Sequence, residues 1–184
     1  MLTQEELMKK QIVFLTSLLL TFTVLAACQD KGKRPSPAAH AQCKFSDGKT
    51  ITIDYSSPRA KGRKIFGDLV PFGEVWRTGA NEATTFVTNA NVSVGGKDVP
   101  AGNYTIFTVP TADKWTLIVN KKTGEWGIPY KYEADELVRT DMKVSPTPSA
   151  VENFMIALSP MGGGCTLNIS WENTQASVDI SEKK

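Results

Sequence analysis

Hydrophobic and polar residues alternate along most of the chain after residue 40, as they do in β-strands that bury one face. Ile51, Ile53 and Tyr55 alternate with polar residues, and Cys43 and Phe45 share their odd parity across a Ser-Asp-Gly-Lys turn. Further alternating runs contain Phe86, Val92, Val94, Trp115, Leu117, Val119, Phe154, Ile156, Leu158, Cys165, Leu167, Ile169, Trp171, Val178 and Ile180. In residues 103–109, by contrast, apolar or β-branched residues occupy both faces.

These short runs, separated by turn residues, predict an all-β fold. We expect a single antiparallel β-sandwich domain with a long ordered loop and little helix. A short helical turn around residues 132–137 is the helix that the pattern allows.

The first part of the chain has the pattern of a targeting segment. Met8-Lys9-Lys10 is followed by a largely apolar run over residues 11–24 and then by Leu-Ala-Ala-Cys at 25–28. A basic start, an apolar middle and small residues before a cleavage site are typical of a secretory signal, and the ending resembles that of a bacterial lipoprotein. The alternative is a transmembrane anchor, but the apolar run is short for the ~20 residues that a span needs.

This pattern predicts three parts of the chain. Residues 1–27 would be the signal peptide, with Met8 as its true start, and Cys28 would carry the lipid. Residues 28–39 are polar and contain proline, as in a flexible tether, and residues 40–184 would form the domain. We therefore expect a cell-envelope protein whose lipid anchors it to a membrane, facing the periplasm or the exterior.

Composition restricts the chemistry. The 184 residues include 21 Lys and Arg against 19 Asp and Glu, a net charge of +2, which argues against a nucleic-acid partner. The single histidine, His40, argues against a multi-histidine metal site and, lying beside the tether, against a Ser-His-Asp triad. No loop has the spacing of a calcium site, so we expect neither metal nor cofactor.

Cysteine usage predicts one disulfide. With Cys28 lipidated, Cys43 and Cys165 remain, and outside the cytoplasm such a pair tends to be oxidised. Two separate free thiols are the alternative.

The segment 56–83 does not read as a strand. It combines four glycines and two prolines with basic residues that include Arg63 and Lys64 and with the aromatic residues Phe66, Phe72 and Trp76. Ordered loops of this length are usually functional. The candidate ligand-binding residues here are Arg63, Lys64, Trp76, Arg77, Asn81 and Glu82. On the alternative interpretation, Arg77 and Glu82 only fix the loop and the aromatic side chains close one end of the domain.

A second irregular segment, residues 121–139, contains Trp126, Tyr130 and Tyr132 among glycines and a proline. Trp126 and Tyr130 are candidates for the opposite wall of the same pocket. On the alternative interpretation, the segment is a long hairpin connection whose aromatic residues cover an edge.

The run Leu-Val-Pro-Phe-Gly-Glu-Val-Trp-Arg-Thr-Gly-Ala-Asn-Glu-Ala-Thr-Thr at 69–85, with Gly-Arg-Lys-Ile-Phe-Gly at 62–67 and Pro-Ala-Gly-Asn-Tyr at 100–104, resembles domain-of-unknown-function family 2911. Shorter matches occur at Trp115-Thr116, Trp126-Gly127, Val138-Arg139 and residues 171–174, so the resemblance spans about residues 40–180. It implies a secreted bacterial β domain and no particular activity.

Three functions are compatible with these observations. We expect a non-catalytic binding module for a glycan or another small polar ligand. A structural component that docks an envelope protein partner is one alternative. A hydrolase that uses Glu82 as acid or base, with Arg77 stabilising charge, is the other.

Overall fold

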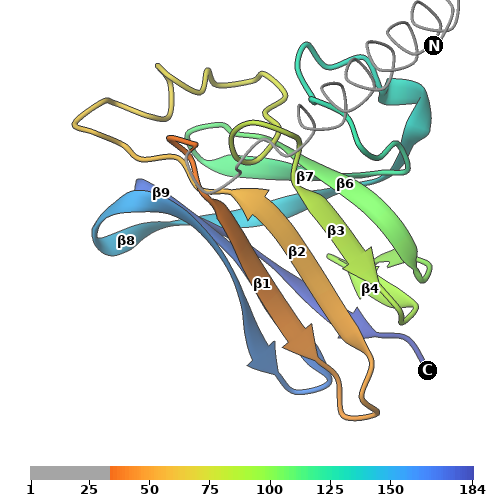
Figure 1. Cartoon of the computed structure of the whole chain (residues 1–184). Coiled ribbons are helices and arrows are strands. Elements are labelled where there is room, and N and C mark those ends of the chain that lie inside the picture. The colour runs from red at the N-terminus through yellow and green to blue at the C-terminus, as the bar shows by residue number, and fades with distance from the viewer. Residues whose placement is uncertain (1–33) are drawn as a thin grey trace, which may run out of the picture. The chain divides into compact units, whose positions relative to one another are not determined.

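The structure is a computed structural model that describes residues 34–184, of which 35–184 form one compact unit. The predicted signal peptide and the predicted lipidation site at Cys28 lie outside the described residues. Within them, the strands are β1 (Ala38–Lys44), β2 (Thr50–Ser56), β3 (Thr85–Thr88), β4 (Val92–Val94), β5 (Lys97–Val99), β6 (Gly102–Val109), β7 (Lys114–Asn120), β8 (Glu136–Met161) and β9 (Gly164–Glu182) (Figure 1). A 3-10 helix, η3, covers Glu133–Asp135, inside the helical turn that the sequence predicts.

All strand pairs are antiparallel, which confirms the predicted fold class. Hydrogen bonds link the strands into one sheet in the order β1-β2-β3-β6-β7-β8-β9-β4-β5, so the division into two layers that defines a sandwich is not confirmed. The first strand begins at Ala38, which places Ala38 and Ala39 in the sheet although we expected them in the tether.

The two halves of this sheet approach each other beside β8. The Ala60 amide donates to the Glu152 carbonyl (2.8 Å) and the Phe154 amide to the Pro58 carbonyl (2.9 Å), so the chain after β2 pairs with β8. The predicted Cys43–Cys165 disulfide is present and joins β1 to β9 with a Cα–Cα distance of 6.5 Å. One core therefore lies between the early strands and the long β8–β9 hairpin.

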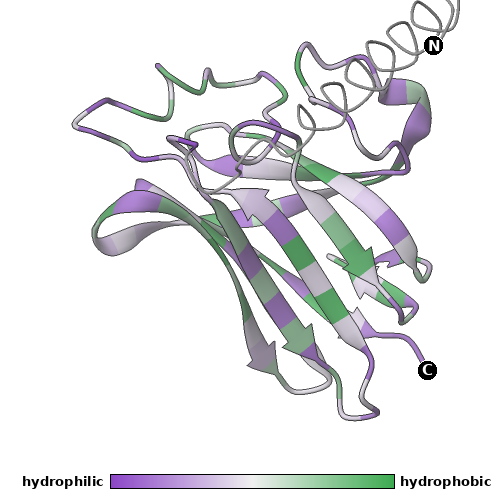
Figure 2. Ribbon diagram, in the orientation of Figure 1, coloured by the Kyte–Doolittle hydropathy of each residue, from purple (hydrophilic) through white to green (hydrophobic). Residues whose placement is uncertain are grey.

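The alternation seen in the sequence sorts residues between this core and the solvent. Figure 2 shows hydrophobic and hydrophilic residues alternating along β1 and β2. Ile51 and Ile53 are fully buried, and Cys43, Phe45 and Tyr55 are buried on the same face. His40 is exposed on β1, where its ring pairs with Asp54 at 2.8 Å.

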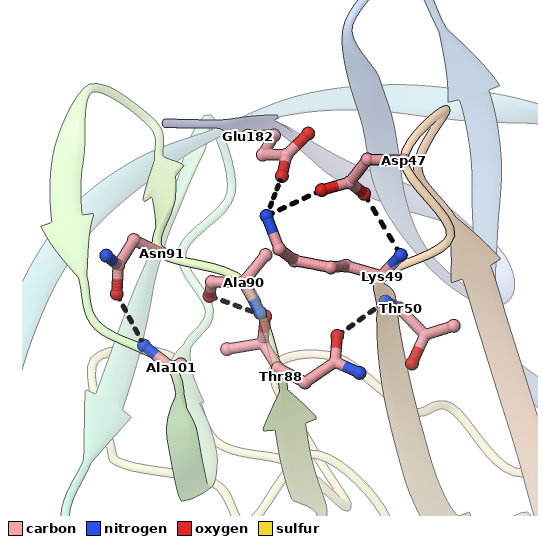
Figure 3. A network of polar contacts seen from close by, with 9 residues as sticks. Asp47, Lys49, Thr50, Thr88, Ala90, Asn91, Ala101 and Glu182 are labelled. Carbon is pink, nitrogen blue, oxygen red and sulfur yellow. Dashed lines mark hydrogen bonds and ion pairs between the residues drawn. The ribbon is translucent and has the colours of Figure 1, made fainter. Parts of the chain in front are cut away.

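One end of the sheet is closed by short turns, and Figure 3 shows the polar contacts that tie them together. The Lys49 ammonium lies between the carboxylates of Asp47 and Glu182, which joins the β1–β2 turn to the last residue of β9. Asn89 accepts a hydrogen bond from the Thr50 amide (2.7 Å), and Asn91 accepts one from the Ala101 amide (3.0 Å). We call this the turn end.

The opposite end, which we call the loop end, carries the two irregular segments, 57–84 and 121–135 (Figure 1). No helix among the described residues is long and apolar enough to cross a membrane.

Candidate functional site

Trp76 lies inside the domain and not on its surface. Its indole stacks on Trp171, with ring centroids 6.0 Å apart, and meets the rings of Phe66 and Phe154 edge to face. Trp76 is 9% exposed, and its Nε1 donates to the carbonyl of Gly79 in its own loop (3.1 Å). The side chain therefore closes the loop end of the core, and a ring this deeply buried has no open face on which a sugar can stack.

Main-chain contacts hold the Trp76 loop against the sheet. The amides of Trp76 and Thr108 each donate to the other residue's carbonyl, at 2.8 and 2.9 Å. Gly79 lies so close to β2 that a Cβ would stand 3.0 Å from the Ser56 carbonyl oxygen. A larger residue at Gly79 would therefore push the loop away from β2.

Asn81 also has a role within the fold. Its Nδ2 donates both to the carbonyl of Ser36 (3.0 Å) and to the hydroxyl of Ser56 (3.0 Å). These bonds fasten the chain just before β1 to the loop end. With both amide hydrogens engaged, the Asn81 amide group is not free to donate to a ligand.

Arg77 and Trp126, one from each irregular segment, meet at the surface. The guanidinium carbon lies 4.9 Å from the centre of the indole ring, which is a cation–π contact. Desolvation lowers the pKa of Arg77, and the nearby charge of Glu82 opposes that shift. Glu82 and Trp126 are exposed, so the two segments together form a surface with both aromatic and charged side chains.

The second segment covers the outer face of β6 and β7, which explains why residues 104–108 are buried on both faces. Phe107 and Ile118 point to this face, and Tyr130 and Tyr132 pack on them. The ring centroids of Phe107 and Tyr130 are 4.8 Å apart. A small second core therefore anchors the segment.

A polar network fixes Tyr130 within that segment. Its hydroxyl donates to Glu136 Oε1 (2.6 Å) and accepts from Asn120 Nδ2 (3.1 Å). Burial and the Glu136 carboxylate raise the pKa of Tyr130. Arg139 binds Glu136 through two nitrogens, at 2.6 and 2.7 Å, and its hydrogen bond is the main cause of a lowered Glu136 pKa.

Between the two segments lies a groove of about 450 Å³. Its lining is mostly apolar, with two carboxylates, and consists of Leu69, Val70, Pro71, Glu74, Val75, Trp76, Ile128, Pro129, Tyr130 and Glu133. Both irregular segments contribute to the walls of this groove. A groove of this size, with apolar walls and a few polar groups, is the usual form of a small-molecule site.

The groove includes only part of the predicted set. Trp76 and Tyr130 line it, whereas Arg77, Asn81, Glu82 and Trp126 do not. Arg63 and Lys64 lie on an exposed turn after β2, where the Arg63 guanidinium donates to the carbonyls of Ala60 and Arg59.

Sequence reasoning missed the two carboxylates. Glu74 is two residues before Trp76, and Glu133 is three residues after Tyr130. Their closeness in sequence to these two candidate residues was the available signal that they belong to the same site. No group of three or more His, Cys, Asp or Glu residues suited to holding a metal ion occurs in the described part of the chain.

Comparison with known proteins identifies the family. No curated protein and no solved structure matches the chain. A family model matches residues 36–180, which include β1 to β8, β9 as far as residue 180, both irregular segments and the groove. The chain therefore belongs to the family described as protein of unknown function (DUF2911).

Proposed function

We propose that this protein is a non-catalytic binding module of the cell envelope, anchored by a lipid on Cys28. Its ligand is a glycan or another small molecule that combines an apolar face with hydroxyl or amino groups. The binding site is the groove between residues 69–76 and 128–133.

The chemistry of the groove carries this proposal. A sugar ring presents C–H groups on one face and hydroxyl groups around its edge. Ile128, Pro129 and Val75 offer an apolar wall to the first, and the Glu74 and Glu133 carboxylates accept hydrogen bonds from the second. Both charged groups in the lining are acidic, so neutral and amino sugars fit better than uronic acids.

The surroundings of Glu82 favour binding over hydrolysis. A carboxyl group that acts as a general acid near neutral pH is usually held in an apolar pocket. Glu82 is exposed and lies beside the Arg77 guanidinium. A role in balancing the Arg77 charge suits this position better than proton transfer.

Calorimetric titration with neutral, amino and uronic oligosaccharides tests the proposal. Residues 35–184 contain the whole core and suffice for the experiment. We expect saturable binding of a neutral or amino sugar, with the sugar recovered unchanged. In Glu74→Gln/Glu133→Gln the affinity should fall roughly tenfold or more, because hydrogen bonds to charged groups contribute about 1.5–3 kcal/mol each.

Asp98→Asn is the matched control, because it removes an exposed carboxylate from β5, outside the groove lining. It should bind like the wild type. The proposal is wrong if no sugar binds, if the sugar is cleaved, or if the groove variant and the control bind equally.

A further inference from the structure

Exposed apolar side chains gather at the loop end. Leu69 and Phe72 are each 45% exposed in the first segment, and Trp126 and Ile128 are 54% and 41% exposed in the second. Leu69 and Ile128 stand on opposite walls of the groove, so the two segments present these side chains around one opening. Large aromatic and aliphatic side chains held in solvent on ordered loops are typical of surfaces that meet a partner or a membrane interface.

The chain also enters the domain at this end. Residues 36 and 37 are held by Asn81 and by the Ser57 amide, which donates to the Pro37 carbonyl (2.8 Å). Cys28 is six residues before Arg34. Even fully extended, that stretch spans only about 20–25 Å. A lipid on Cys28 would therefore hold the loop end close to the bilayer.

A basic turn completes the surface. Lys61, Arg63 and Lys64 are exposed within four residues, directly after the part of the chain that pairs with β8. Glu74 and Glu133 lie at the same end but line the groove. Residues 61–72 thus carry three exposed cationic side chains and one exposed carboxylate, Asp68, and this excess of positive charge can meet anionic lipid headgroups.

We propose that the loop end docks on the surface of an anionic lipid bilayer. Leu69, Phe72, Trp126 and Ile128 enter the interface, and the basic turn contacts the headgroups. The proposal deepens the proposed function, because docking turns the groove toward the bilayer and makes membrane-borne amphiphiles its accessible ligands. The surface itself consists of residues 61–72 and 126–128 and does not require the lipid to make contact.

Co-sedimentation of residues 35–184 with vesicles tests the docking without the anchor. Vesicles of phosphatidylcholine with phosphatidylglycerol are compared with phosphatidylcholine alone. We expect stronger sedimentation with the anionic vesicles. Leu69→Ser/Phe72→Ser should lower the partition coefficient about tenfold or more, since two half-exposed apolar side chains lose their burial. Lys61→Gln and Lys64→Gln should each lower it about fivefold.

Tryptophan fluorescence locates the contact. Trp126 is exposed, whereas Trp76, Trp115 and Trp171 are buried. A change in tryptophan emission on docking therefore reports a change in the surroundings of Trp126. We expect the emission to shift to shorter wavelength with anionic vesicles, and Trp126→Phe to abolish the shift without abolishing sedimentation.

Met155→Ser/Met161→Ser is the matched control, because these methionines are 47% and 41% exposed on β8, outside the surface. No sedimentation with anionic vesicles overturns the proposal, and so does sedimentation that the control weakens as much as Leu69→Ser/Phe72→Ser. Sedimentation that is equal with both lipids overturns it as well. The Glu74→Gln/Glu133→Gln variant separates this proposal from sugar binding, because it should lose affinity for the sugar while sedimenting at least as well as the wild type.

Discussion

The two ends of this sheet are closed by different means. At the turn end, short turns place Lys49 between two carboxylates and use asparagine side chains to satisfy backbone amides. At the loop end, long segments carry Trp76 and Phe66 into the core and leave other large apolar side chains in solvent.

This difference separates scaffold from candidate site. Satisfied backbone groups and surface ion pairs need no long loop, so the turn end stabilises the fold with few residues. The loop end buries part of each segment, which holds the rest of the segment in a defined position. A groove with rigid walls follows from that arrangement, and function commonly lies on such loops.

The largest effect should come from Trp76, with Trp126 at the same end as its comparison. Trp76→Ala removes the centre of the aromatic cluster and should cost about 3–5 kcal/mol. At about 2–4 °C per kcal/mol, the Tm should fall by roughly 6–20 °C. Trp126→Ala removes an exposed ring and should change the Tm by only a few degrees. Thermal unfolding of both variants checks this, and equal shifts would show that the cluster does not close the core.

The disulfide should have the next largest effect. Cys43→Ala/Cys165→Ala removes a bridge between residues 122 apart in the sequence and should destabilise the domain by about 2–4 kcal/mol. The groove lies at the loop end, on residues that the bridge does not touch. Denaturant unfolding should therefore shift while sugar affinity at room temperature stays the same. If the variant lost both stability and sugar affinity, the groove would depend on the disulfide, contrary to this prediction.

Glu136 should give the loop end a pH dependence. The Arg139 guanidinium holds the pKa of Glu136 below its ordinary value of 4.5. A carboxylate with a lowered pKa in the folded state stabilises the fold above pH of about 4.5, and this contribution is lost as the pH falls through the folded pKa. Glu136→Gln should cost about 1 kcal/mol at pH 7. Its Tm should then decline less steeply than the wild type's below pH of about 4.5, and parallel declines would contradict this.

Arg77→Ala should have a smaller effect. Arg77 contacts Trp126 through a cation–π interaction at the surface, which contributes about 0.5–1 kcal/mol. The Tm should therefore fall by only a few degrees. Arg77→Lys is the matched control, because it retains the positive charge. A loss near that of Trp76→Ala would mean that Arg77 is part of a buried ion pair, which costs far more to break.

Lys49→Met should have the smallest effect, and high salt should reduce it. Lys49 and Asp47 are exposed, and such ion pairs stabilise proteins weakly and are screened by salt, whereas the Glu182 side chain is only 8% exposed and its pair is screened less. Thermal unfolding at two salt concentrations measures this. A large loss in both would show that the turn end depends on its charges more than its exposed position indicates.

The sequence predicted the scaffold better than the site. The strict alternation around Ile51 and Ile53 assigned their faces, because only inward residues of a strand reach the core. Cysteine arithmetic predicted the Cys43–Cys165 bridge. The long hairpin was not predicted, because Pro146 and Pro148 interrupt the alternation within β8 and register shifts accompany them.

From the sequence, the groove could be predicted only as a place where two segments that contain aromatic residues lie side by side. Trp76 and Asn81 are residue types that often bind ligands, which made them candidates. In the structure, Trp76 packs in the core and Asn81 binds the chain just before β1. Apart from their closeness in sequence to Trp76 and Tyr130, nothing marked Glu74 and Glu133, because their meeting at one groove depends on how two distant loops fold.

On the proposed function, the loop end binds the ligand and the turn end only supports the fold. Amide hydrogen exchange of residues 35–184, with and without the sugar that binds best in the titration, tests it most directly. We expect slower exchange in residues 69–76 and 128–133 and no change in residues 45–50 and 89–101. Protection confined to the turn end, or spread evenly over both ends, would contradict it.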